Sequence, residues 1–122
     1  MRLGRVNAQK SELGNITRVA INGVDRIRLI PVCDIVRLAS EGSYTILHTR
    51  RKEEVLATRS LISFERQLAG SGFLRTHQKH LVNLDYVREM RKIGSGIVVL
   101  EDGVRIPVAT RRKPAVMSRL LA

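Results

Sequence analysis

The richest group of chemically active side chains in this sequence lies between residues 73 and 83. Apolar Phe73 and Leu81-Val82 flank this segment and predict a loop that is anchored firmly to the core. Such a donor-rich loop suits contact with phosphates and base edges, and a glutamine can form two hydrogen bonds with adenine in the major groove. A surface turn whose histidines bond its own backbone explains the same residues, so both interpretations stay open. The polar members of the segment are Arg75, His77, Gln78, Lys79 and His80.

A second cationic group stands near the C-terminal end, in Thr110-Arg-Arg-Lys-Pro-Ala115. Pro114 is typical of the first turn of a helix, where a missing N–H is tolerated. Arg111, Arg112 and Lys113 then crowd the positive end of the helix dipole, which is unfavourable for cations. The last 20 residues contain five basic and no acidic side chains. An unneutralised cluster of this kind indicates a phosphate site; a solvated basic helix end is the alternative.

The whole chain is strongly basic, with a formal net charge of +11 from 22 basic and 11 acidic residues. A field of this size attracts polyanions, which are DNA, RNA or an anionic membrane surface. Genomic base composition can explain why 17 of the bases are Arg and five are Lys. It does not explain a twofold excess of bases over acids, so the charge favours a nucleic-acid partner.

The sequence predicts a cytoplasmic location. Cys33 is the only cysteine, so an internal disulfide is impossible and a reducing compartment is expected. Beside apolar Val32, its side chain should itself be buried. No apolar run approaches the roughly 18 residues of a membrane span, and no signal-peptide core follows Met1. We therefore expect no membrane partner.

Enzymatic activity is not indicated. Cys33, His77 and Asp85 could be combined on paper into a nucleophile, a base and an orienting group, but no motif places them together. The sequence also has no zinc-ligand set, no glycine-rich phosphate loop and no paired carboxylates, so we expect no metal and no cofactor. An RNA-binding protein is a stronger alternative, although RNA platforms stack bases on exposed aromatic side chains and aromatics are only 3% of this chain. A module that docks a protein or an anionic membrane is the third alternative.

The length of 122 residues fits one domain with a real core. Residues 1–15 lack periodicity and are interpreted as a flexible arm or linker, and residues 16–122 as the domain. Alternating apolar and polar residues predict strands over 17–22, 26–30, 35–39, 44–49, 55–58, 87–93, 96–100 and 104–107. A short helix should begin after Ser60, carry Leu61, Phe64 and Leu68, and end at Gly70; a last helix should span 110–121.

The expected fold is therefore mainly β with short helices, a β-rich α+β domain of small antiparallel sheets arranged in sequence. The short connections between the strands favour this arrangement. No helix-turn-helix pair and no basic zipper is apparent. If the protein reads DNA, loops must do the reading.

Several motifs together resemble those of the LytTR family of bacterial DNA-binding domains. Phe73-Leu-Arg-Thr-His77 followed by Leu81-Val-Asn83 is similar to the family's Phe-x-Arg-x-His loop that leads into Val-Asn. Ile35–Tyr44 resembles its strand with a Glu-Gly-x-Tyr turn, and Arg59-Ser-Leu61 the start of its first helix. Ile106-Pro-Val108 with Arg111-Arg112 resembles its C-terminal block. These motifs occur in family order over about residues 16–121.

The resemblance implies sequence-specific binding of double-stranded promoter DNA, with loops that enter successive major grooves and two copies on a repeated site. It also implies a receiver domain or sensor as a further partner. Base-contacting positions of the family fall near Tyr44, on Gln78 and on Arg111. The chain departs from the family at Gln78-Lys79, where Arg-Ser is common, and at Ala109-Thr110, where Ser-Arg is common, so its DNA preference need not be the usual one. The full predicted DNA-binding set is Tyr44, Arg75, His77, Gln78, Lys79, Arg111, Arg112 and Lys113.

Overall fold

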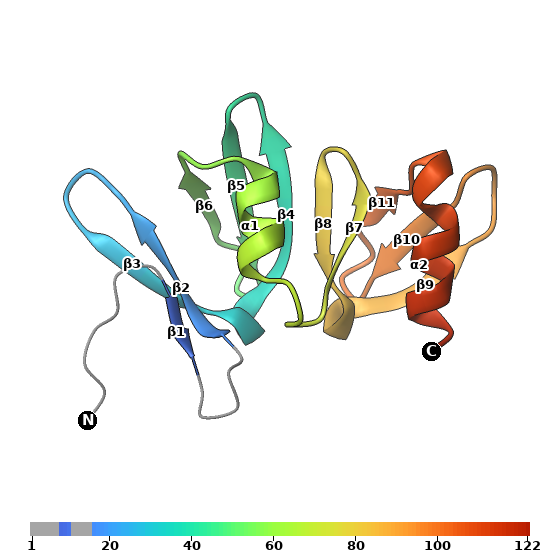
Figure 1. The fold of residues 1–122 in the computed structure, drawn as a ribbon, viewed down its shortest axis with the longest axis horizontal. Helices are drawn as coiled ribbons and strands as arrows, with labels where there is room; N and C mark the ends of the chain where they lie inside the picture. Colours follow the sequence, from blue (N-terminus) through green and yellow to red (C-terminus); the bar gives the residue numbers. More distant parts are fainter. Residues whose placement is uncertain (1–7, 11–15) are drawn as a thin grey trace.

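The computed structural model describes residues 8–10 and 16–122, and these form three antiparallel sheets that follow one another in chain order (Figure 1). The first sheet has the order β1-β2-β3, with β1 (Ala8–Lys10), β2 (Ile16–Asn22) and β3 (Ile27–Pro31). The central sheet has the order β6-β5-β4-β8-β7, with β4 (Ile35–Glu41), β5 (Tyr44–Thr49), β6 (Glu54–Ala57), β7 (Phe73–His77) and β8 (His80–Asn83). The third has the order β11-β10-β9, with β9 (Val87–Arg91), β10 (Ile97–Leu100) and β11 (Arg105–Pro107).

Short helices connect and cover these sheets. The α-helices are α1 (Leu61–Gln67) and α2 (Lys113–Leu120), and the 3-10 helices are η1 (Val32–Asp34), η2 (Leu84–Tyr86) and η3 (Thr110–Arg112). The predicted fold class, mainly β with small antiparallel sheets, is confirmed. The Ser60 side chain accepts a hydrogen bond from the Ser63 N–H and caps α1, as predicted. The single helix expected over 110–121 is divided into η3 and α2.

Two further expectations differ from the structure, and another falls mostly outside the described residues. The predicted arm over residues 1–15 lies mostly outside the described residues, but Ala8–Lys10 within it forms β1 and pairs with β2. Cys33 is exposed rather than buried, because it lies in η1 at the surface. The segment 73–83 is not a loop: it is the hairpin of β7 and β8, with only Gln78 and Lys79 in its turn.

The hairpin escaped prediction because it is buried on both faces. In β7, Phe73 packs in one hydrophobic core and its neighbour Leu74 in the other. In β8, Leu81 and Val82 divide in the same way. A strand covered on both sides has no alternation of apolar and polar residues, and a short apolar run does not distinguish it from an anchored loop.

Two hydrophobic cores lie on opposite faces of the central sheet. The first is built between the central sheet, the first sheet and α1, and the second between the central sheet, the third sheet and α2. Because β7, β8 and β4 supply side chains to both, these strands cannot shift relative to either end of the molecule. The first core comprises Val19, Ile21, Ile30, Val32, Ile35, Leu38, Leu47, Val55, Ala57, Leu61, Phe64, Leu68, Phe73 and Leu81. The second comprises Val36, Leu74, Val82, Val98, Leu100, Ile106, Val108 and Val116.

The turns between strands are gathered at one edge. Figure 1 shows the β4–β5 turn, the β7–β8 turn and the start of α2 along the upper edge of the molecule. The short helices η1 and η2 lie at the opposite end, since η1 precedes the lower end of β4 and η2 follows the lower end of β8. The antiparallel sheets thus align several tips in one row.

Replacement of a side chain in the two-sided hairpin should destabilise the whole domain. Leu81 is 1% exposed, and Leu81→Ala should lower the free energy of unfolding by about 2–5 kcal/mol, because it removes buried methyl groups and leaves a cavity. Leu121→Ala is the matched control, since Leu121 is 78% exposed, and should change it by less than about 0.5 kcal/mol. Urea unfolding followed by circular dichroism measures both. Equal effects of the two substitutions would contradict the assigned core.

Candidate nucleic-acid interface

The first tip of the upper edge is the turn between β4 and β5. Glu41 pairs with Tyr44, so Gly42 and Ser43 alone form the turn. Gly42 has a φ of 63°, a conformation that side chains disfavour and glycine adopts readily. This tight turn places Tyr44 at the edge, where it is 46% exposed.

The second tip is the turn between β7 and β8, which carries the exposed side chains of Gln78 and Lys79. No glycine forms it, and its shape depends on side chains instead. His77 Nδ1 accepts a hydrogen bond from the Lys79 N–H at 3.1 Å, which confirms that this histidine bonds the backbone of its own segment. The Ser40 N–H donates to the Lys79 carbonyl at 3.0 Å and fastens this turn to the neighbouring strand β4.

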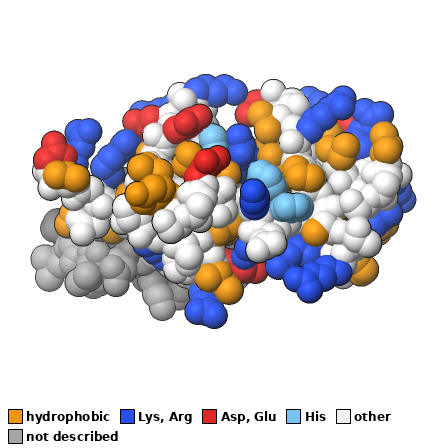
Figure 2. Space-filling view, turned by 90° about the horizontal axis from the view of Figure 1, so that it is seen from above, with side chains coloured by type: hydrophobic (Ala, Val, Ile, Leu, Met, Phe, Trp, Pro, Cys, Tyr) orange, Lys and Arg blue, Asp and Glu red, His pale blue; other side chains and the backbone are white. Residues whose placement is uncertain are grey.

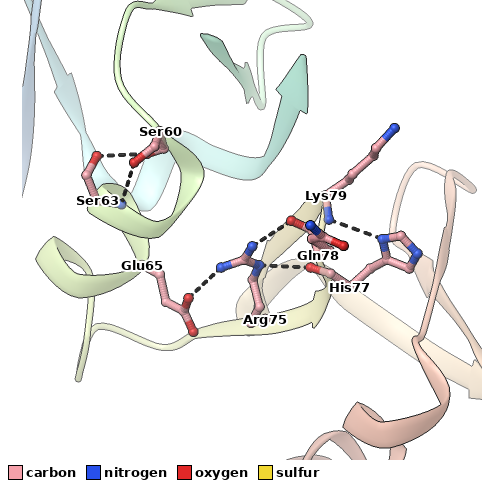
Figure 3. A network of polar contacts seen from close by, with 7 residues as sticks. All are labelled: Ser60, Ser63, Glu65, Arg75, His77, Gln78 and Lys79. Atoms are coloured by element: carbon pink, nitrogen blue, oxygen red, sulfur yellow. Dashed lines mark hydrogen bonds and ion pairs between the residues drawn. The ribbon is translucent and has the colours of Figure 1, made fainter. Parts of the chain in front are cut away.

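The largely buried side chain of Arg75 also stabilises this turn. Its Nε donates to the His77 carbonyl at 2.8 Å, and a terminal nitrogen donates to the Gln78 carbonyl at 2.5 Å (Figure 3). The other terminal nitrogen forms an ion pair with Glu65 of α1 at 2.5 Å. The Arg75 side chain is only 10% exposed. Each of the three nitrogens of this guanidinium donates a bond within the protein, and together these bonds connect the turn to α1.

The third tip is the start of α2. The Ala109 N–H donates to the Thr76 carbonyl at 2.8 Å, which ties the segment before η3 to β7. Arg111 is exposed, whereas Arg112 and Lys113 are half-buried. The Lys113 ammonium donates to the Gly94 carbonyl at 3.3 Å, in the turn between β9 and β10. Pro114 lies in the first turn of α2, as predicted.

Lysine and arginine side chains supply the positive charge of this edge. Figure 2 looks down on it and shows basic side chains spread over the surface, with acidic ones mainly in the left half and histidines near the middle. Burial, and then the nearby His77, lower the pKa of His80 from 6.5 to about 4. Burial also lowers the pKa of His48, with Arg37 adding to the effect. At neutral pH these two imidazoles are therefore uncharged, and the positive charge that faces a ligand belongs to lysine and arginine side chains, among them Lys79, Arg111 and Arg112.

The residues that could have formed a catalytic or metal centre do not meet. Cys33 and Asp85 lie in η1 and η2, whereas His77 lies at the opposite end of the central sheet. Among the described residues, no group of three or more His, Cys, Asp or Glu side chains is arranged to hold a metal ion. In the same part of the chain, no helix has both the length and the apolar character needed to cross a membrane.

Two residues that organise this edge were not among the predicted set. Glu65 pairs with Arg75 from ten positions earlier in the chain, and no sequence signal announces such a tertiary pair. Arg59 precedes the N-cap of α1, and its carbonyl accepts a hydrogen bond from the Thr45 hydroxyl at 2.7 Å. Its position directly before the predicted N-cap Ser60 is a sequence signal that could have pointed to a role for Arg59 at this edge.

Comparisons with known proteins agree on one family. A model of the LytTr DNA-binding domain matches residues 25–121. The chain is 33% identical over 107 residues to the heme-containing CO-sensing transcriptional regulator RcoM 2 of Paraburkholderia xenovorans, covering 85% of this chain and 39% of that protein. It is 23% identical over 94 residues to the sensory transduction protein LytT of Bacillus subtilis, covering 75% of this chain and 39% of that one.

A solved structure shares the fold. It is the LytTr DNA-binding domain of a putative methyl-accepting/DNA response regulator from Bacillus cereus, with a TM-score of 0.72 and 19% sequence identity. The match covers 87% of this chain and 97% of the solved one. The present chain thus spans about two fifths of the length of the two regulators above and nearly all of a solved domain.

Removal of the Arg75 side chain should loosen the β7–β8 turn. Arg75→Ala leaves the carbonyls of His77 and Gln78 without their donors, which should cost about 1–3 kcal/mol of unfolding free energy. Amide hydrogen exchange at Gln78 and Lys79 should accelerate more than exchange in β10, which lies in the third sheet. Glu65→Gln should have a smaller effect, because it keeps both bonds to the turn. Uniform acceleration over the whole domain would contradict the local role.

Proposed function

Since this chain belongs to the LytTR DNA-binding domain family, we propose that it binds double-stranded promoter DNA sequence-specifically, with its tips in successive major grooves. DNA binding in transcription regulation is the function of the family. The finer statement, that the upper edge of the molecule reads base edges, rests on the arrangement of the three tips.

The observation that carries the proposal is that exposed polar side chains stand on a row of rigid tips. Hydrogen bonds fasten the tips to one another: Ser40 to Lys79, and Ala109 to Thr76. A surface that is already ordered loses little conformational entropy when it binds. The tips are narrow two-residue turns and a helix start, and such projections fit a major groove about 12 Å wide.

The proposed roles follow from exposure. Gln78 and Arg111 are exposed at two different tips, and their side chains match the hydrogen-bonding edges of adenine and guanine in the major groove. Tyr44 offers a ring and a hydroxyl at the first tip, the β4–β5 turn. Lys79 and Arg112 supply phosphate contacts. His77 accepts the Lys79 N–H through Nδ1, so in its neutral form Nε2 carries the proton and is a donor.

Two copies on a repeated site are proposed because a single small module buries too little surface for tight specific binding. We also propose that the whole protein carries a sensory or receiver module, since the similar proteins named above are described as a CO-sensing regulator and a sensory transduction protein. Promoter DNA of a bacterium lies in the cytoplasm, and the proposal places the chain there.

The proposal separates residues that read bases from those that hold phosphates. Gln78→Ala or Arg111→Ala should cost about 1–3 kcal/mol of binding free energy on the selected site and relax the preference at one base pair. Lys79→Ala should weaken binding to all duplexes alike and flatten the slope of log affinity against log salt by about one unit. Selection from a random duplex library, followed by titration at several salt concentrations, measures these effects.

Two outcomes would count against this assignment. If Arg111→Ala weakens binding to selected and scrambled duplexes equally, then Arg111 holds the backbone and does not read a base. If single-stranded RNA competes better than the selected duplex for the unmodified protein, the RNA-binding alternative replaces the proposal.

The spacing of two half-sites should matter if two copies bind one face of the duplex. Half-sites should lie about one helical turn apart or a whole multiple of it. Insertion of roughly five base pairs turns one copy to the opposite face and should weaken binding of the pair sharply, whereas insertion of roughly ten should restore it. Electrophoretic mobility shifts over a series of spacers measure this. Equal affinity at every spacer would show that the copies bind independently.

A further inference from the structure

Arg59 is fixed at the upper edge, directly before the Ser60 N-cap of α1. Its carbonyl accepts the Thr45 hydroxyl at 2.7 Å, and Thr45 follows Tyr44 in β5. The backbone of Arg59 is therefore fastened to the strand that presents the first tip. In Figure 3, Ser60 lies toward the same end of the molecule as Gln78 and Lys79.

The guanidinium of Arg59 is held in one plane. Its central carbon lies 3.9 Å from the centre of the Phe64 ring, and Phe64 is fully buried in the first core. Nε donates to the Ser63 hydroxyl at 3.2 Å, and that hydroxyl donates to the Ser60 carbonyl at 2.7 Å. A cation stacked on a rigid ring and bonded on one side has little freedom left to lose on binding.

The two terminal nitrogens of this guanidinium have no acceptor among the described residues. Other arginines of the chain differ: Arg28 pairs with Glu53, Arg50 with Asp34 and Arg75 with Glu65. Arg59 is half-buried, and burial lowers its pKa from the ordinary value. This guanidinium is partly dehydrated, and its two terminal NH2 groups are ordered but without a partner in the part of the chain that the structure describes. It is therefore suited to an oxyanion, which can accept two parallel hydrogen bonds from it.

We propose that Arg59 is a phosphate-binding residue that holds one phosphodiester of the duplex beside the Tyr44 tip. The inference rests on the proposed function and adds a contact to it. A phosphate held here fixes the register of the first tip along the backbone, since Thr45 links Arg59 to that tip. Arg59 thus positions the protein on the duplex and does not read its sequence.

A purely structural role is the alternative, in which Arg59 covers Phe64 and supports α1. The two roles differ in their dependence on one phosphate. Substitution of a structural residue weakens binding equally whichever phosphate of the duplex is neutral. Substitution of a phosphate-binding residue has no effect once the phosphate that it binds is neutral. The test is therefore a series of duplexes of the selected sequence, each with one phosphate replaced by an uncharged methylphosphonate.

The full chain and three variants should be titrated against this series. Arg59→Gln should weaken binding to the unmodified duplex by roughly tenfold, the loss expected for one charge-assisted hydrogen-bonded contact, and reduce the salt slope by about 0.9. At one methylphosphonate position, Arg59→Gln and the unmodified protein should bind equally. Arg59→Lys should keep the salt slope and lose part of the affinity, because it retains the charge without the planar fork.

Arg66→Gln is the matched control, because Arg66 is an exposed arginine in the last turn of the same helix; it should bind as the unmodified protein does. If Arg59→Gln shows the same deficit at every methylphosphonate position, the inference is overturned and the role is structural. If Arg59→Gln fails to fold, the same series of duplexes is titrated with Arg59→Lys. One methylphosphonate position at which Arg59→Lys binds as well as the unmodified protein supports the inference, and the lack of such a position overturns it. If the unmodified protein binds no duplex, the proposed function itself fails, and the inference with it.

Discussion

The rest of the structure depends on the burial of the β7–β8 hairpin on both faces. Its neighbouring residues enter different cores: Phe73 and Leu81 one, Leu74 and Val82 the other. A register shift by one residue would exchange every side chain between the two cores. The hairpin therefore has one permitted position, and the first and third sheets are built outward from it. This explains how sheets of three, five and three strands form one continuous row.

This constraint also determines how the second tip is made. A two-residue turn between strands normally uses glycine or asparagine with positive φ, but Gln78 and Lys79 adopt no such conformation. Instead the Arg75 guanidinium and the His77 imidazole supply the hydrogen bonds that shape the turn. Because the strands are fixed by burial, side chains suffice to set the turn between them. The turn residues are then free to be polar and exposed, as a binding tip requires.

The sequence predicts the parts of this fold whose signals are local. The alternation in β2 to β5, the glycine-containing turns before β10 and β11, and the Ser60 cap each depend on residues close together in the chain. The two-sided hairpin has no such signal, because its apolar run matches an anchored loop equally well. The orientation of the Arg75 side chain was likewise unpredictable, because its partner Glu65 lies in α1, which only the tertiary fold brings close to Arg75. The second and third tips were found from their donor-rich and cationic side chains and the first through family resemblance, whereas their alignment in one row came from the structure.

The contrast between Arg75 and Arg59 shows why composition cannot assign a binding role to an arginine. Both lie at the same edge and both guanidiniums are partly or largely buried. Arg75 has a carboxylate and two carbonyls as partners, and its side chain is only 10% exposed, so little of this guanidinium is open to a phosphate. Arg59 has an aromatic face and one hydroxyl, which orient the guanidinium without satisfying its terminal donors. The proposal for Arg59 thus follows from the partners and the exposure that the fold gives each guanidinium, and not from the residue type.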